Sequence, residues 1–180
     1  MTMWRGSLAA AGAFVVMGWA AAVDARPAYL LANCVLGWGL WWLSWIDWQH
    51  MRLPDVLTLP LLACGLLVTW LTEPDALASR MLGALAGYCV FRAVGLGYRQ
   101  WRGHEGLGQG DAKLVAAGGA WLGWQALPWV VLIAALAGLT FALIRNRRGV
   151  ALTATTALPF GPALALAIWL CRLHGVPAQF

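Results

Sequence analysis

Charged side chains are scarce in this chain of 180 residues: Asp, Glu, Lys and Arg together make up 11% of it, and only seven residues are acidic. Hydrophobic residues make up 62%, whereas a soluble domain averages about 45–50% apolar and about 25% charged residues. The apolar residues spread over the whole length, which leaves no room for a soluble second domain. The composition therefore predicts one integral membrane domain over residues 1–180, surrounded by membrane lipid.

Paired cysteines are also absent. The four cysteines lie singly within apolar segments: Cys34, Cys64, Cys89 and Cys171. Neither His50 nor His104 has companion ligands at metal-site spacing, so we expect no metal site and no cofactor. The net charge of +5 is not concentrated on a polar segment with interleaved aromatics, which argues against nucleic acid as a partner.

Seven apolar segments follow one another along the chain: 7–23, 28–46, 56–71, 76–98, 112–124, 127–144 and 155–172. A helix needs about 20 residues to cross a bilayer, so the fifth segment is too short to span alone. It is either a half-buried helix or runs on into the sixth. We predict an all-α bundle of six to seven transmembrane helices, one of them short. The first segment also resembles a signal peptide, although a retained helix is the simpler interpretation.

Basic residues are distributed unevenly between the two ends of these predicted helices. With seven crossings, nine of the twelve lie at one end, and the other end has only Arg26, Arg80 and Arg172. Short cytoplasmic loops hold the excess of Lys and Arg. The loops around 47–55, 99–111 and 145–149 are therefore predicted to face the cytoplasm.

Asp47 closes a long apolar helix. The helix dipole disfavours a negative charge at a C-terminal end, and an ionisable residue at the membrane boundary is costly, so Asp47 is a candidate functional residue. Asp55, eight residues on, follows Pro54 in the predicted first turn of the next helix. A carboxylate there complements the helix dipole, which gives Asp55 a structural explanation.

A glycine-rich stretch delivers a second candidate, Asp111, to the start of an apolar helix. Glycines in this stretch, among them Gly108 and Gly110, permit tight turns and the approach of another backbone. Asp111 alone is explained equally well as a helix cap. Small residues at four-residue spacing, Gly83 with Gly87 and Gly119 with Gly123, let helices approach closely.

Taken together, the two aspartates suggest a specific chemistry. Both are predicted at the same membrane boundary, and two adjacent carboxylates cannot both ionise easily. One stays protonated while the other acts as a base toward a shared water, as in the aspartic protease dyad. Such a pair hydrolyses peptide bonds without a metal. The competing class is a transporter or channel in which the acids bind a cation or relay protons, although no related halves are seen.

Five motifs follow one another over about residues 30–172: Asp47, Leu53-Pro54-Asp55, Gly108-Gln109-Gly110-Asp111 with Lys113, Gly119 to Trp124, and Leu158-Pro159-Phe160-Gly161-Pro162. This ordered set resembles the type IV prepilin peptidase family. The presenilin-like proteases share Gly-x-Gly-Asp, but their first motif is Tyr-Asp where this chain has Ile46-Asp47.

The resemblance implies a protease of the bacterial inner membrane that removes the basic leader of prepilins or pseudopilins, cutting after a glycine. The family's catalytic aspartates fall on Asp47 and Asp111. Supporting or substrate-binding roles are carried over to Gly108, Gly110, Lys113, Glu105 and Asp55. Longer members carry a zinc-binding cytoplasmic domain associated with N-methylation. We expect that domain to be missing here, and the resemblance leaves open whether any methylation activity remains. A silent assembly factor for pili or secretion is the remaining alternative.

Overall fold

The computed structural model describes residues 12, 15, 18–22, 27–103, 108–148 and 159–175. Within these ranges the chain forms α-helices and two short 3-10 helices, and no strand. The predicted all-α class is confirmed. Most of the first predicted segment, and the start of the last one before Pro159, lie outside the described residues.

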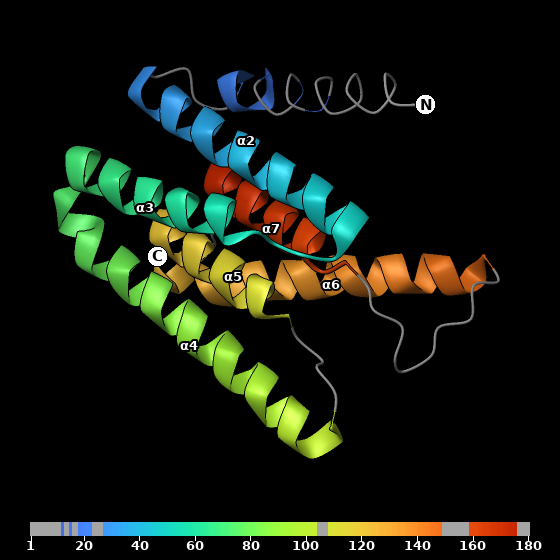
Figure 1. Ribbon diagram of the computed structural model, residues 1–180. Coiled ribbons are helices and arrows are strands. Elements are labelled where there is room, and N and C mark those ends of the chain that lie inside the picture. The colour runs from blue at the N-terminus through green and yellow to red at the C-terminus, as the bar shows by residue number, and fades with distance from the viewer. Residues whose placement is uncertain are drawn as a thin grey trace.

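The helical elements follow one another in this order: α2 Pro27–His50, α3 Asp55–Thr72, η1 Pro74–Ala76, α4 Leu77–Arg102, α5 Gln109–Leu122, η2 Trp124–Ala126, α6 Leu127–Arg147 and α7 Gly161–His174. Successive α-helices run in opposite directions (Figure 1). One end of the bundle therefore gathers the last turns of α2, α4 and α6 with the first turns of α3, α5 and α7. We call this the active end, and the opposite one the far end.

In the described part of the chain, four helical stretches are long and apolar enough to cross a membrane: Tyr29–His50, Asp55–Thr72, Pro74–Arg102 and Trp124–Arg147. Helices α5 and α7 have 14 residues each. At 1.5 Å per residue each is about 21 Å long, short of the ~30 Å hydrocarbon core. The protein is thus a multi-pass membrane protein with two short helices inside its bundle.

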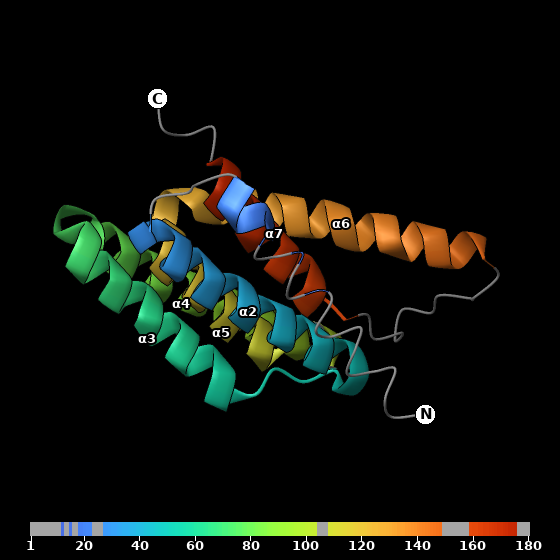
Figure 2. The same ribbon diagram turned by 90° about the horizontal axis from the view of Figure 1, so that it is seen from above.

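Helix α5 forms the centre of the bundle (Figures 1 and 2). Nine of its 14 residues are buried, and the fully buried Trp121 donates its indole N–H to the carbonyl oxygen of Leu61 at 2.8 Å. The helix ends at Leu122, because Gly123 turns the chain with a φ of 89°. Of the two possibilities that the sequence left open, α5 is therefore the separate helix and does not run on into α6.

Glycines bring α4 and α5 into backbone contact, as their spacing predicted. A Cβ atom on Gly83 would lie 2.8 Å from the carbonyl oxygen of Gly119, and one on Gly119 would collide with the Gly83 carbonyl. One turn further, a Cβ on Gly87 would lie 3.1 Å from a methyl group of Val115. Close approach of this kind replaces hydrophobic association between helices inside a membrane.

A buried ionic cluster ties the helices together at the far end. Arg80 is only 8% exposed and donates to the Thr69 hydroxyl and to the Glu73 carboxylate, each at 2.6 Å. The Tyr29 hydroxyl donates to the other Glu73 oxygen at 3.1 Å. Helices α2, α3 and α4 are thereby linked. The sequence identified Arg80 only as an orientation signal and gave no hint of this structural role.

Candidate active site

Asp47 lies in the last turn of α2, as predicted, and its side chain turns into the protein. The residue is 6% exposed. One carboxylate oxygen, Oδ2, accepts a hydrogen bond of 3.0 Å from the backbone N–H of Gly161, at the start of α7. A residue 114 positions away in the chain thus holds the Asp47 carboxylate in place.

Position 161 has room only for glycine, because the Asp47 carboxylate lies directly against it. A Cβ atom built there would lie 2.6 Å from Asp47 Oδ2 and 2.9 Å from its carboxyl carbon. Phe160 caps α7 and Pro162 occupies its first turn, where proline's missing N–H costs nothing. The Pro-x-Gly-Pro motif therefore starts α7 and presents a free backbone N–H to Asp47. The sequence flagged the motif but not this contact.

Asp111 lies in the first turn of α5, three residues after the N-cap Gly108. The Gly108 backbone donates to its carboxylate, which is the arrangement of the N3 residue in a capping box. The helix-cap interpretation of Asp111 is therefore correct in part, since the N-cap position itself belongs to Gly108. Among the glycines predicted to support the site, this one contacts Asp111 directly.

The electrostatic surroundings of Asp111 couple it to Asp47. Asp111 lies in α5, which is not among the four stretches long enough to span a membrane. Burial is the largest influence on its carboxyl group and helps to raise the pKa from 3.8 to about 6. The charge of Asp47 also raises this pKa, while the Gly108 hydrogen bond lowers it. Within the described ranges, neither carboxylate forms a salt bridge. The two acids predicted to act together are thus brought together.

The chain reverses direction between α2 and α3 beside these acids. Met51 has a positive φ of 52°, uncommon for a residue with a side chain, and its N–H bonds the Asp47 carbonyl oxygen at 2.9 Å. Leu53 packs against the start of α5, where a Cβ on Gly110 would lie 2.7 Å from the Leu53 Cβ. Gly110 therefore permits close packing of the start of α5 on this turn. This packing determines how far Asp111 lies inside the protein.

Lys113 does not pair with either of the two buried acids. Its ammonium group forms a salt bridge of 2.5 Å with Asp55, in the first turn of α3. Two of the predicted supporting residues thus form an ion pair between α5 and α3. Asp55 also occupies the first helical turn predicted for it.

The remaining predicted residues contribute less to the described site. Glu105 and His104 lie outside the described residues. His50 is exposed in the last turn of α2. In the described part of the chain, no three His, Cys, Asp or Glu side chains are grouped so that they could hold a metal ion.

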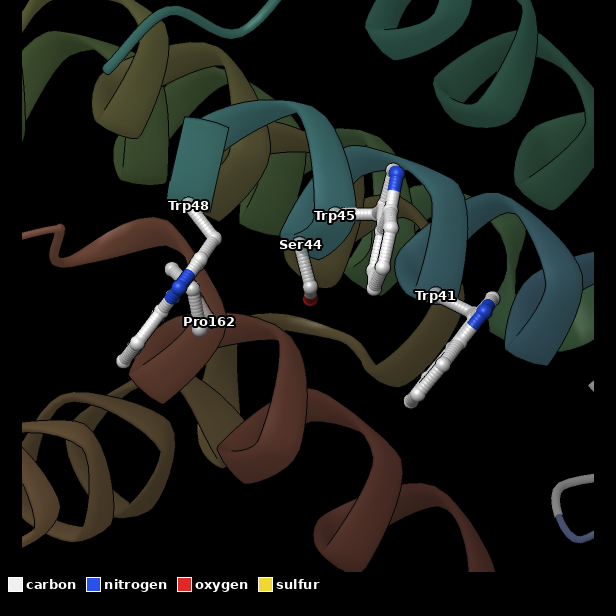
Figure 3. Close-up of a pocket in the computed structure, with 5 residues that line it drawn as sticks. All are labelled: Trp41, Ser44, Trp45, Trp48 and Pro162. Carbon is white, nitrogen blue, oxygen red and sulfur yellow. The ribbon is translucent and has the colours of Figure 1, made fainter. Parts of the chain in front are cut away.

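An aromatic pocket opens between the last turns of α2 and the start of α7 (Figure 3). Trp41, Trp45 and Trp48 of α2 line it together with Ser44 and Pro162, and its volume is about 230 Å³. Ser44 lies one helical turn before Asp47 and donates to the Leu40 carbonyl oxygen at 2.7 Å. The sequence analysis assigned no role to these three tryptophans. Their spacing of three and four residues is the signal that places them on one face of α2.

Known proteins match this arrangement of motifs. The model of the type IV leader peptidase family matches residues 34–143, which includes both buried aspartates. The chain belongs to the type IV leader peptidase family. The prepilin leader peptidase/N-methyltransferase of Aeromonas salmonicida is 45% identical over 149 residues, 81% of this chain and 50% of that protein.

Two further relatives bear the same name. The protein from Burkholderia pseudomallei is 45% identical over 156 residues, covering 87% of this chain and 48% of its own length. The protein from Pseudomonas aeruginosa is 42% identical over 144 residues, covering 80% and 49%. This leader peptidase family chain thus spans about half the length of the curated relatives it matches. No solved structure matches it.

Proposed function

We propose that this protein is an aspartyl leader peptidase in which Asp47 and Asp111 together activate a water molecule. The observation that carries the proposal is a pair of carboxylates on α2 and α5, Asp47 buried and Asp111 partly buried, with no cation of the described residues paired to them. A buried carboxylate pair that shares one proton is the arrangement of aspartic proteases. Membership of a leader peptidase family supports the same reaction.

The reaction needs one proton on the pair. The ionised carboxylate removes a proton from water as the water oxygen attacks the peptide carbonyl carbon, and the protonated carboxyl donates to the carbonyl oxygen. Collapse of the tetrahedral intermediate then breaks the C–N bond. The carboxyl group that took the water proton donates it to the departing nitrogen, and a hydroxyl of the intermediate returns a proton to the other carboxylate, which restores the pair. Because the pair titrates as one unit, we assign neither acid nor base to one aspartate.

The proposed substrate is a prepilin or pseudopilin with a basic leader, cut after a glycine that precedes an apolar helix. The activity for which the relatives are named supports this choice. We place the active end at the cytoplasmic face of the inner membrane. In the described part of the chain, this end carries Arg52, Arg99, Arg102, Lys113, Arg145, Arg147 and Arg148, and Lys and Arg are enriched on cytoplasmic sides.

The test is cleavage of a synthetic substrate by the purified protein in detergent, with the products weighed by mass spectrometry. The probe has a leader of lysines and arginines, a Gly-Phe junction and an apolar helix of about 20 residues. We expect one cut after the glycine, and its loss in Asp47→Asn and in Asp111→Asn. Asp75→Asn is the matched control, since it removes an exposed carboxylate at the far end of the bundle and should still cleave. Cleavage by Asp111→Asn would refute the carboxylate pair.

A further inference from the structure

An apolar groove runs between α4 and α6. Its volume is about 570 Å³, and we define it by six of its lining residues: Ala86, Val90, Val94, Val115, Leu127 and Val131. Val115 of α5 forms the floor, while α4 and α6 form the walls and diverge toward the active end (Figure 1). Among the described residues, only apolar side chains and glycine, apart from the Trp124 indole, line this groove.

The register of α4 on α5 relates the groove to the carboxylates. The two helices are antiparallel, and Gly83 faces Gly119 while Gly87 faces Val115. Continuing this register by one turn brings Phe91, which also lines the groove, level with Asp111. Val90 and Val94 lie on either side of that level. The α4 wall therefore extends past the depth of the acids.

Phe160 links the other side of the groove to the site. It lines the groove and directly precedes Gly161, whose N–H holds Asp47. Val115 lies one helical turn beyond Asp111. The groove thus borders both segments that position the acids. It continues the candidate active site into the apolar interior of the bundle.

The groove lining selects an apolar occupant. Val90 and Val94 are 57% and 60% exposed in a stretch of α4 long enough to cross a membrane. From Ala86 to Val94 the wall covers about 12 Å, two turns of a helix. Ala86 and Gly87 are small, which allows another helix to approach α4 closely.

We propose that this groove binds the apolar helix of the substrate and so places the scissile bond at the level of Asp47 and Asp111. This inference rests on the proposed function, since it assigns the occupant from the substrate class. A leader is joined directly to the helix that succeeds it. A helix lying against Val90 and Val94 therefore has its N-terminal end, to which the leader is joined, at the depth of the acids.

Cysteine cross-linking tests the position of the substrate helix. The protein carries Asp111→Asn to prevent cleavage, and Cys34, Cys64 and Cys171 are replaced by alanine. One form keeps the native, exposed Cys89, and the matched form combines Cys89→Ala with Val90→Cys. These neighbours differ by about 100° around α4, and only residue 90 lines the groove. The probe is the synthetic substrate with one cysteine in the first turns of its helix.

We expect the Val90→Cys form to give several times more disulfide-linked product than the Cys89 form. Higher yield from Cys89, or equal yield from both, overturns the groove as the binding site. Cleavage is measured in parallel with Asp111 restored. Absence of cleavage by the unsubstituted protein overturns the proposed function, and the assigned occupant with it. Cleavage without cross-linking at position 90 overturns the groove alone.

Filling the groove provides a kinetic test. Val90→Phe places a larger side chain where the helix would lie, and we expect KM for the synthetic substrate to rise at least about tenfold with a smaller change in kcat. The control is Val35→Phe, at an exposed valine of α2 outside this groove. Unchanged KM in Val90→Phe, or an equal rise in Val35→Phe, contradicts the proposal.

Discussion

The two ends of the helix bundle treat buried charge in opposite ways. At the far end, Arg80 is neutralised by Glu73 and hydrogen-bonded to Thr69, with Tyr29 completing the cluster. At the active end, the Asp47 carboxylate is held by a backbone N–H, that of Gly161, and by no cation of the described residues, although a lysine lies close to Asp111 in the sequence. That lysine, Lys113, is engaged with Asp55 instead.

We interpret the paired charges of the far end as structural and the unpaired carboxylates of the active end as serving the proposed reaction. A paired buried ion stabilises the arrangement around it, and removing one partner leaves an uncompensated charge. Carboxylates without a cation gain nothing of the kind, but burial lets a carboxyl group hold its proton to a higher pH than in water, so that it can act as acid or base. We therefore expect substitutions at the far end to change stability, and substitutions at the active end to change catalysis.

The largest expected effect is the loss of stability in Arg80→Met. Breaking a fully buried ion pair costs about 3–5 kcal/mol, and the cost here is smaller because Glu73, which is left without its cation, is partly exposed. Thermal unfolding in detergent, followed by circular dichroism, should show a clear fall in Tm. Cleavage by the protein that remains folded should be unchanged.

A double variant controls for the size of the side chain. Arg80→Met with Glu73→Gln leaves no charge behind, so it should recover part of the lost stability. If Arg80→Met unfolds at the same temperature as the original protein, the cluster is not structural and the contrast between the ends fails.

Gly161→Ala should give the next largest effect, on catalysis. The new Cβ would lie 2.6 Å from Asp47 Oδ2, so the carboxylate or the start of α7 must move. A misplacement of about 1 Å at a reacting group costs on the order of a hundredfold in rate. We expect kcat in the cleavage assay to fall by this amount while the protein stays folded.

Gly138→Ala is the matched control for Gly161→Ala. A Cβ at Gly138 in α6 would make only ordinary contacts of 3.6 Å with Phe160. We expect its cleavage rate to stay close to that of the original protein. Equal rates in both alanine variants would show that the Gly161 contact does not position Asp47.

Lys113→Gln should give the smallest effect. Its partner Asp55 is half-exposed, and exposed ion pairs contribute about 0–1 kcal/mol. Kinetic assays should show a change of less than about tenfold, since the pair supports the start of α5 without touching the buried acids. A loss of activity as complete as that of Asp111→Asn would show that Lys113 takes part in the reaction. It would weaken the contrast between the paired charges of the far end and the unpaired carboxylates of the active end.

Composition and segment lengths were sufficient to predict the membrane class, the all-α fold and the central short helix. Apolar stretches and helix-starting prolines are local signals, so α3 and α5 begin within a few residues of their predicted positions. The sequence also identified both aspartates, because acids are rare in this chain and an acid at a membrane boundary is costly.

Contacts between distant residues could not be predicted in the same way. The hydrogen bond from Gly161 to Asp47 depends on where α7 meets α2, and nothing near either residue encodes that crossing. The partners of Arg80 could not be predicted either, because they depend on how α3 and α4 pack together. For Lys113 the sequence left two roles open and did not point to Asp55 as its partner. The groove beside α4 depends on the angle between α4 and α6, which apolar composition does not fix.

The central claim is that Asp111 takes part in the proposed reaction although its buried position lowers the stability of the protein. The most direct test compares Asp111→Asn with the original protein, for both cleavage and Tm, across pH. Below pH 3.8 the folded and unfolded states both hold the proton. As the pH rises from there to about 6, the unfolded state loses the proton first, so the original protein loses stability that the asparagine variant keeps. We predict an inactive variant whose Tm exceeds that of the original protein at neutral pH, by a margin that disappears in acid. A variant that still cleaves, or one that unfolds at a lower temperature at neutral pH, would contradict the account.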